Sequence, residues 1–510
     1  MAIQQMFLGG GGAISDSYWW RYYTDSYSNQ FNDIAVDSDG NVIAVGSLTG
    51  YNQSIFLKYD EDGTLDSLKK TTLNSSHGGG ISGVCTDSSG NFYTAEKMNT
   101  KTNGSGASID IVKYNSSLTK QWNSEIGSEG STTNYGSGAR YDNIQYSSIS
   151  SDGTNIWIGC DPNLGSTWGT KGSLVVLDAS DGSFEMDRRS QLPQSGSAGY
   201  GTSMAATAIT SVGDCAFVGK GPWGTAMKDG AWVGLWEKLP QGSATWTVDP
   251  KWSKHLKADD TANSECGFSD VAVDSSDNVI AVGKMNTGGA WNGMVMKFSN
   301  KSSATPGTVL WEKSLGGGFP SYFSTVVCDS NDDVIVGGWS ERTDTGISGT
   351  NIQASYTIIK YSGSNGNLEW MHCVNMDSGY WTSGAGSLRL AIDSKDNLYG
   401  GFQCNGSSSH WPNNGNMGGV VFKLPSDGTL KGTYAGDGGS DGTFVYGTCE
   451  TGTNNHDVNY ATNNNYFPLA THSSYSSLGW TSLFGQEGLT SHNTTISDHT
   501  GATTGGSTIE

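Results

Sequence analysis

Proline and charged residues are scarce in this sequence. Proline contributes 10 of 510 residues and charged residues 15%, whereas glycine contributes 73 residues. Many glycines without proline-rich linkers indicate many tight turns, which is typical of an all-β protein. Acidic residues outnumber basic ones, and the formal net charge is −21. This excess disfavours binding to nucleic acid or to an anionic membrane, because both require a basic surface.

Long hydrophobic runs and the usual features of a signal peptide are also scarce. No run of about 18 apolar residues is present, so we expect no membrane insertion. The opening segment, M-A-I-Q-Q-M-F-L-G-G-G-G, has no Lys or Arg before its short apolar patch, which argues against a signal peptide. The eight cysteines form no C-x-x-C pair, so we expect buried free thiols and folding in a reducing cytosol.

Motifs for catalysis are absent or weak. The sequence has no H-E-x-x-H, no P-loop and no H-x-x-x-H spacing. Residues 438–442, G-G-S-D-G, fit the nucleophile-elbow pattern, but glycine is so common that one chance match is expected. Four histidines near the C-terminus have spacings that match no metal motif: His456, His472, His492 and His499. We therefore predict a protein that is not an enzyme, with no catalytic residue, metal or cofactor.

A repeat is the main feature that the sequence does contain. Its clearest copy, F-S-D-V-A-V-D-S-S-D-N-V-I-A-V-G, runs from Phe268 to Gly283. Two apolar runs joined by an acidic turn predict a β-hairpin. The pattern recurs about every 59 residues. We assign its turn acids to Asp37, Asp87, Asp152, Asp214, Asp274, Asp329 and Asp393.

Each hairpin is followed by a third apolar run, such as residues 294–298, and often by a run with a tryptophan, such as residues 310–313. Seven units of four strands predict a seven-bladed β-propeller, in which neighbouring blades bury each other's faces. A solenoid is the alternative, and ring closure distinguishes the two. The strand-like residues 18–25 favour closure, as the outer strand of the seventh blade.

This pattern divides the chain into three parts. Residues 1–18 are expected to be an N-terminal docking segment, residues 19–435 the seven-bladed propeller, and residues 436–510 an irregular C-terminal extension. The extension lacks the repeat and is rich in Gly, Asn, Thr and Ser, so we expect it to need the propeller or a neighbour for order.

The two ends of the strands differ in their connections. One face carries short acidic turns, in which Asp bonds its own backbone, with a weakly held calcium ion as the alternative. The other face carries long loops, including residues 220–231 and 339–355. Six loop aromatics are candidate binding residues for a partner or a sugar: Tyr51, Trp168, Trp223, Trp291, Trp339 and Trp411. The alternative is that these aromatics pack inward between the blades.

The motif D-S-x-G-N-V-x-x-x-G, seen in residues 37–46 and similarly in residues 274–283, resembles a bacterial β-propeller repeat family often called SBBP. That resemblance covers about 400 residues and implies the fold, but it names no activity. The opening M-A-I-Q-Q-M-F-L-G-G-G-G is similar to the starts of virion structural proteins of marine tailed bacteriophages, including cyanophages.

The second resemblance implies a phage structural protein, tail-associated or an exposed appendage, that assembles in the host cytoplasm and resides in the virion. Its expected partners are other virion proteins in a symmetric homo-oligomeric assembly and, through the loop face, a host glycan or receptor. Two alternatives remain open: a non-viral carbohydrate-binding or adhesion propeller, and a glycan-degrading enzyme.

Overall fold

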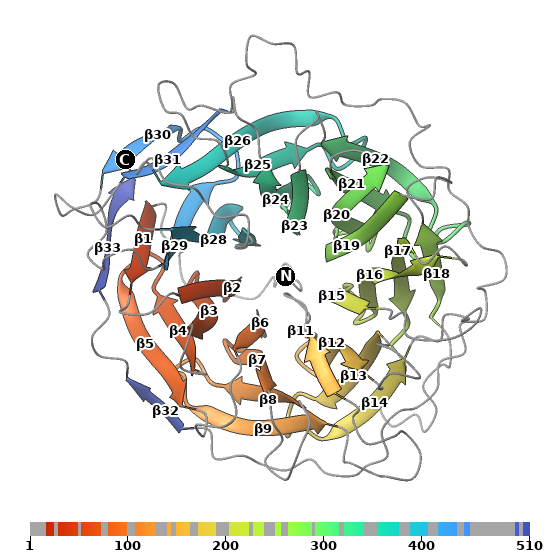
Figure 1. The fold of residues 1–510 in the computed structure, drawn as a ribbon, viewed down its shortest axis with the longest axis horizontal. Helices are drawn as coiled ribbons and strands as arrows, with labels where there is room; N and C mark the ends of the chain where they lie inside the picture. Colours follow the sequence, from red (N-terminus) through yellow and green to blue (C-terminus); the bar gives the residue numbers. More distant parts are fainter. Residues whose placement is uncertain are drawn as a thin grey trace.

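The computed structural model contains strands and turns, and no helix, in the residues that it describes. Those residues are 17–24, 29–48, 53–72, 80–98, 108–127, 140–143, 149–163, 172–189, 203–223, 228–238, 250–256, 264–287, 291–315, 321–340, 355–376, 388–405, 417–435, 443–448, 495–498 and 503–509. They form seven antiparallel sheets arranged as the blades of a ring (Figure 1). The predicted seven-bladed β-propeller is therefore confirmed.

The first four blades follow the chain in order. Blade 1 contains β2 (Asn29–Val36), β3 (Val42–Leu48), β4 (Gln53–Tyr59) and β5 (Leu65–Thr72). Blade 2 contains β6 (Ile81–Thr86), β7 (Phe92–Met98), β8 (Ser108–Tyr114) and β9 (Lys120–Gly127). Blade 3 contains β10 (Arg140–Asn143), β11 (Ile149–Ser151), β12 (Asn155–Asn163), β13 (Ser173–Asp178) and β14 (Phe184–Arg189). Blade 4 contains β15 (Ser203–Ile209), β16 (Cys215–Trp223), β17 (Lys228–Trp236) and β18 (Trp252–Leu256).

The last three blades include the closing one. Blade 5 contains β19 (Ser264–Val273), β20 (Val279–Thr287), β21 (Asn292–Phe298) and β22 (Val309–Leu315). Blade 6 contains β23 (Ser321–Cys328), β24 (Val334–Ser340), β25 (Ser355–Tyr361) and β26 (Leu368–Met376). Blade 7 contains β27 (Arg389–Ile392), β28 (Asn397–Asn405), β29 (Met417–Pro425) and β1 (Tyr18–Thr24).

Ring closure is provided by β1. This strand pairs with β29, so the N-terminal strand completes the last blade. The prediction that residues 18–25 form a strand of the seventh blade is confirmed. Trp19, Trp20, Tyr22 and Tyr23 on β1 are each at most 2% exposed and belong to the core shared by blades 6, 7 and 1. The solenoid alternative is excluded, because the two ends of the repeat array lie in one sheet.

The described parts of the C-terminal segment are strands, which differs from the irregular extension expected there. Strand β31 (Thr443–Thr448) pairs with β26 on blade 6, and β30 (Gly432–Ala435) pairs with β31. Strand β32 (Thr495–Asp498) pairs with β5, and β33 (Thr503–Ile509) pairs with β1. All four lie at the rim of the ring (Figure 1). Strands β31, β32 and β33 pair with outer blade edges, whose backbone groups can accept another strand.

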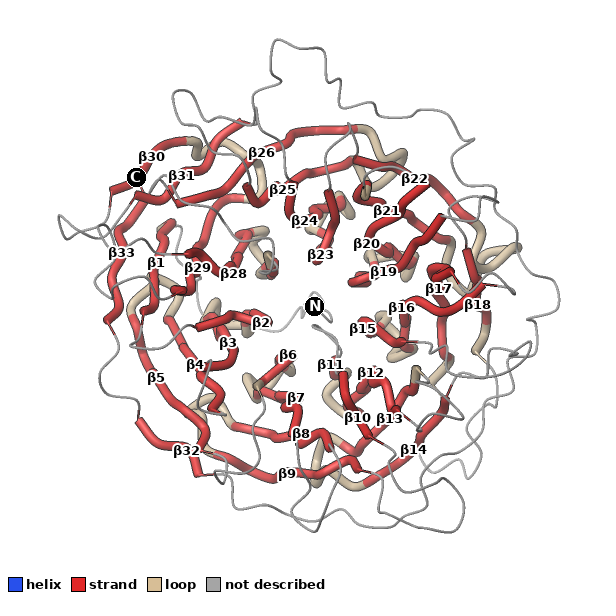
Figure 2. Tube along the Cα trace, in the orientation of Figure 1, coloured by secondary structure: helices blue, strands red, loops and turns tan. Residues whose placement is uncertain are grey.

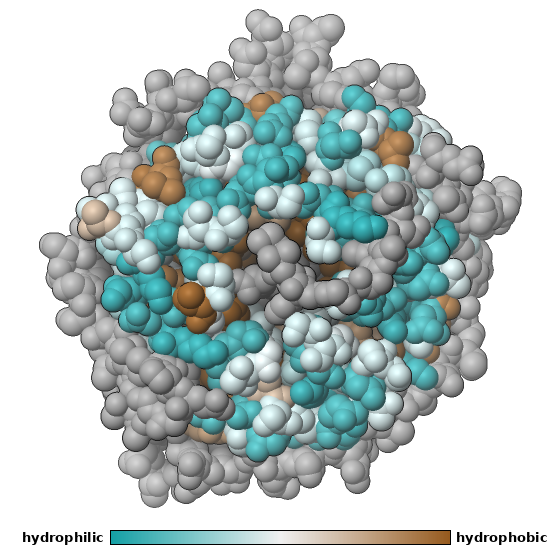
Figure 3. All heavy atoms as spheres, turned by 180° about the vertical axis from the view of Figure 1, so that it is seen from behind, coloured by the Kyte–Doolittle hydropathy of each residue, from teal (hydrophilic) through white to brown (hydrophobic). Residues whose placement is uncertain are grey.

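Burial changes from the hub to the rim. Strand β6 is buried at every position, as expected for a strand covered on both faces, whereas most residues of the outer strand β22 are half-buried or exposed. The inner strands surround the hub and the outer strands form the rim (Figure 2). In the face shown in Figure 3, the described surface is mainly hydrophilic, with small separate hydrophobic patches. Among the described residues, no helix could cross a membrane.

The cysteine prediction holds at five positions and fails at one. Cys85, Cys160, Cys215, Cys266 and Cys328 are free. Cys373, in contrast, is disulfide-bonded, and its partner is not among the cysteines whose side chains the structure describes. Cys373 lies on β26, opposite Gly447 of β31, a segment far away in the sequence.

Candidate functional site

The acidic turns bond their own backbone, as predicted. Asp274 accepts hydrogen bonds on Oδ1 from the backbone N–H groups of Ser276 (2.9 Å) and Asn278 (2.8 Å). Its Oδ2 accepts a hydrogen bond from the Asn278 side chain (2.9 Å) and contacts Nζ of Lys297 (2.7 Å). Asp37 makes the same turn contacts with Asp39 and Asn41. These carboxylates are structural, because their oxygen atoms are used within the blade.

One turn acid was assigned to the wrong position. In blade 4, Thr210 occupies the place that Asp37 has in blade 1, because its N–H bonds the carbonyl of Asp214 and its Oγ1 accepts the Asp214 N–H. Asp214 takes the place of Asn41, and its Oδ2 pairs with Lys301 of blade 5 (2.5 Å). The register is four residues off because blade 4 has a threonine where the repeat has its first aspartate.

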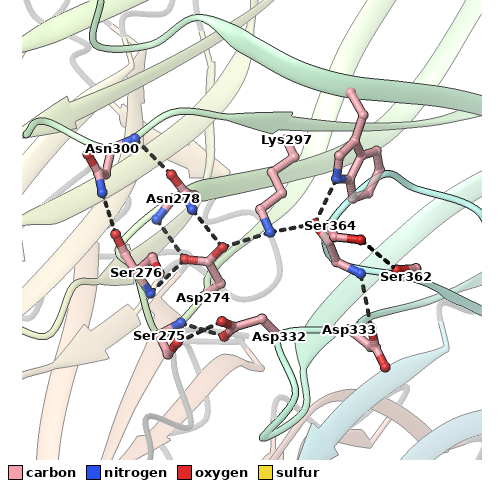
Figure 4. A network of polar contacts seen from close by, with 12 residues as sticks. Asp274, Ser275, Ser276, Asn278, Lys297, Asn300, Asp332, Asp333, Ser362 and Ser364 are labelled. Carbon is pink, nitrogen blue, oxygen red and sulfur yellow. Dashed lines mark hydrogen bonds and ion pairs between the residues drawn. The ribbon is translucent and has the colours of Figure 1, made fainter. Parts of the chain in front are cut away.

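Neighbouring turns are joined by serine–aspartate pairs. Ser275 of blade 5 donates its N–H to Oδ1 of Asp332 and its hydroxyl to Oδ2, and each bond is 2.7 Å long (Figure 4). The same pair of bonds joins Ser211 to Asp277 and Ser330 to Asp396. The turn face therefore connects blades 4, 5, 6 and 7 with one repeated contact.

A second repeated contact uses the tryptophan of the outer strand. Nε1 of Trp311 and Nζ of Lys297, both in blade 5, donate to the carbonyl oxygen of Gly363 in the third turn of blade 6 (3.0 and 2.7 Å; Figure 4). In the same way, Trp122 and Lys113 both donate to the backbone carbonyl of Ala179. Trp19 and Lys423 both donate to the backbone carbonyl of Glu61. These tryptophans connect blades rather than bind a ligand.

The loop end of the ring carries the six predicted binding residues, of which the structure describes the side chains of two. Tyr51, Trp168 and Trp411 lie outside the described residues. Trp223 lies at the end of β16 and pairs with Lys228, and nothing is described of its side chain. Trp291 and Trp339 are described, on neighbouring blades, and both are half-buried.

Two predicted loops are shorter than expected. The connection assigned to residues 220–231 is reduced to residues 224–227, because β16 and β17 continue to pair as far as Trp223 and Lys228. Trp339 lies inside β24, paired with Tyr322 and Tyr356, and not in a loop. In both places, strand pairing extends the hairpin beyond the end of the apolar pattern.

Trp291 lies beneath a lysine. Nζ of Lys284 on β20 is 4.4 Å from the centroid of the Trp291 ring, which is a cation–π contact. The backbone carbonyl of Trp291 accepts a hydrogen bond from the N–H of Ser321, at the start of blade 6 (2.7 Å). This bond fixes the Trp291 backbone against the next blade.

The loop end of blade 6 continues this arrangement with an aromatic pair. The rings of Tyr322 and Trp339 are 5.6 Å apart, and both side chains are half-buried. Trp339 also packs against the core of blades 6, 7 and 1, and its Nε1 has no acceptor among the described residues. Trp339 therefore packs partly inward between the blades, as the alternative interpretation of the loop aromatics expected.

A second lysine lies on the neighbouring blade 4. Lys220 on β16 is exposed, and its side chain lies against Gly267, the residue that pairs with Lys284 across β19 and β20. Partial burial lowers the pKa of Lys284, and the positive charge of Lys220 lowers it further. Sequence reasoning missed Lys220, Lys284 and Tyr322. The shared V-G-K in residues 218–220 and 282–284 was the signal that could have identified the lysines.

Together these residues form a cationic–aromatic arc over three blades. It consists of Lys220, Lys284, Trp291, Tyr322 and Trp339, and we use the name loop-face arc for this set. Aromatic rings and ammonium groups can contact sugar rings, anionic groups or protein partners. In the described part of the chain, no group of three or more His, Cys, Asp or Glu residues is arranged to hold a metal ion.

Comparisons with known proteins give only a similarity of fold. No family model and no curated protein match this sequence. A protein of unknown function from Dyadobacter fermentans is 9% identical, with a TM-score of 0.41 over 79% of this chain and 96% of that one. Drosophila semaphorin 1a is 10% identical, with a TM-score of 0.43 over 79% of this chain and 87% of that one. A periplasmic gluconolactonase from Pseudomonas aeruginosa is 10% identical, with a TM-score of 0.41 over 70% of this chain and 96% of that one. The propeller assignment itself rests on the strand pairing.

Proposed function

We propose that this protein is a recognition propeller that binds its partner through the loop face and has no catalytic role. The unequal use of the two faces carries this proposal. Side chains of the acidic turns bond within a blade or to the next blade, as Asp274 and Asp332 do. The loop-face arc instead presents paired aromatic and cationic groups at the opposite end of the strands.

Sugar is the partner class that these groups favour. Tryptophan and tyrosine provide large contact areas at little cost in side-chain entropy, and they pack against the apolar face of a sugar ring. Three further predicted aromatics outside the arc are also tryptophans: Trp168, Trp223 and Trp411. Trp339 is itself a member of the arc. Their positions on different blades suit an extended ligand.

A glycan-binding screen tests this role. We expect the purified chain to bind a subset of bacterial surface glycans, and a variant with Trp168, Trp223 and Trp411 changed to Ala to bind them at least tenfold more weakly. A matched control changes Lys395→Gln, an exposed residue of an acidic turn on the opposite face. Unchanged binding by the triple variant would refute a role for these three tryptophans in recognition.

We further propose that the protein is a component of a tailed-phage virion, either in the tail or as an exposed appendage. The N-terminal resemblance supports this placement, and residues 1–18 or the C-terminal segment would dock to other virion proteins in a symmetric assembly. A disulfide at Cys373 fits a protein that is finally exposed to an oxidising medium. Mass spectrometry of purified virions tests this proposal, and absence of the chain from the particles contradicts it.

A further inference from the structure

The loop-face arc contains a charge arrangement that is unusual in this protein. The chain has 49 acidic and 28 basic residues, yet two lysines lie on adjacent blades at the same end of their strands. Lys220 and Lys284 both follow a glycine at equivalent positions of β16 and β20. Gly267 lies between them, as the cross-strand partner of Lys284 and a packing contact of Lys220.

The charge of Lys220 acts on Lys284. Partial burial lowers the pKa of Lys284, Lys220 lowers it further, and the carboxylate of Glu265 on β19 opposes these effects more weakly. The positive charge of Lys220 thus acts at Lys284, and a bound anion would form charge-assisted hydrogen bonds to these groups.

An aromatic ring lies within reach of the same cation. Lys284 Nζ is 4.4 Å from the Trp291 ring centroid, and the Trp291 carbonyl bonds Ser321, next to Tyr322 of the aromatic pair. Lys284 covers one face of the Trp291 ring, so a sugar unit packed against the exposed part of this half-buried ring would lie next to the ammonium group. The Tyr322–Trp339 pair lies farther along the arc, where an adjoining sugar unit would follow.

We propose that the loop-face arc is a binding site for acidic oligosaccharides, in which Lys220 and Lys284 bind the carboxylate or sulfate group and Trp291 packs against the sugar ring. This inference rests on the proposed recognition function and specifies its ligand class. It assigns charge selectivity to the lysines and ring binding to the tryptophan. The two roles can be separated by experiment.

Three hexasaccharides separate these roles. Hyaluronan carries carboxylates, chondroitin sulfate carries carboxylates and sulfates, and chitohexaose is neutral. Calorimetric titration of the full chain should give roughly tenfold tighter binding for the acidic sugars than for chitohexaose. A difference between the two acidic sugars identifies the preferred anionic group, and the preference should weaken as salt is raised.

Three variants complete the test. The double variant Lys220→Gln, Lys284→Gln should lose the preference for acidic sugars, whereas Trp291→Ala should weaken binding of all three. Lys395→Gln should change neither, and thermal unfolding of each variant checks its fold. Equal affinity of the native chain for acidic and neutral sugars, or an unchanged preference in the double variant, overturns the inference. In either case, loss of neutral binding in Trp291→Ala would leave the recognition function standing. If no sugar binds or no loop-face substitution alters binding, the glycan-recognition function fails as well.

Discussion

Five glycines determine how closely neighbouring blades approach. Gly63, Gly182, Gly307, Gly366 and Gly428 all have φ between 68° and 77°, and each lies against a tryptophan of the preceding blade. A Cβ atom on Gly366 would lie 2.7 Å from Cε3 of Trp311. Glycine is needed at this position both for its left-handed backbone and for the space above it.

Gly366→Ala should therefore destabilise the protein through two effects. The left-handed backbone costs an alanine about 1 kcal/mol, and the contact with the Trp311 ring adds about 1–3 kcal/mol. Gly153→Ala is the matched control, because Gly153 has φ of 80° and nothing within 4 Å of its Cβ position. Thermal unfolding should show a larger loss for Gly366→Ala, and equal losses would contradict the packing role of Trp311.

Three aspartates occupy turn positions that usually require glycine. Asp277, Asp332 and Asp396 have φ between 62° and 64°, whereas blades 1 and 2 have Gly40 and Gly90 at the same position. The conformation is unfavourable for a side chain, although Asp tolerates it better than most residues. Each of these carboxylates accepts two hydrogen bonds from a serine of the preceding blade, which offsets the cost.

Besides its strand pairing with β26, β31 contacts blade 6 through an aromatic cluster. Nδ1 of His372 is 2.8 Å from the Tyr446 hydroxyl, and the His372 ring stacks on Trp370 at 4.8 Å. Burial lowers the pKa of His372 to about 4, and Lys431 contributes a smaller effect. The cluster is stable while the imidazole is neutral.

This attachment should weaken in acid. The pKa of His372 in the folded chain lies below the value of about 6.5 in an unfolded chain, so the folded state binds fewer protons. The stability that His372 contributes is therefore complete above about pH 6.5 and is lost as the pH falls toward 4. His372→Gln does not titrate, so its difference in Tm from the native chain should change across this window. A constant difference would contradict this assignment.

The N-terminal strand and the C-terminal strands occupy different positions in their sheets. Strand β1 lies between β29 and β33, so it is an internal strand, whereas β32 and β33 are outer additions to blades 1 and 7. Complete burial of large side chains such as Trp19 and Trp20 contributes roughly 1.5–3 kcal/mol each. We therefore expect β1 to stabilise the closed ring more than the last two strands do.

Deletion of residues 1–24 and deletion of residues 495–510 test this difference. Loss of β1 removes four buried aromatic residues and exposes the edge of β29, so it should lower Tm strongly and cause aggregation. Loss of β32 and β33 leaves at least four strands in every blade, and the ring should remain monodisperse with a modest decrease in Tm. Similar effects of the two deletions, measured by thermal unfolding and size-exclusion chromatography, would contradict closure by β1.

The sequence alone determined the number of blades, the hairpins and the closing strand. These features depend on local periodicity and on turns such as residues 274–278, which repeat visibly. The tertiary structure decided which residues meet across blades. Ser275 and Asp332, or Lys220 and Gly267, are far apart in the chain, and only the packing of one blade on the next brings them together. The register of blade 4 and the strands of the C-terminal segment depend on such contacts. The repeated V-G-K of residues 218–220 and 282–284 points to the two lysines of the loop-face arc, but only the packing of the blades places them beside its aromatic residues.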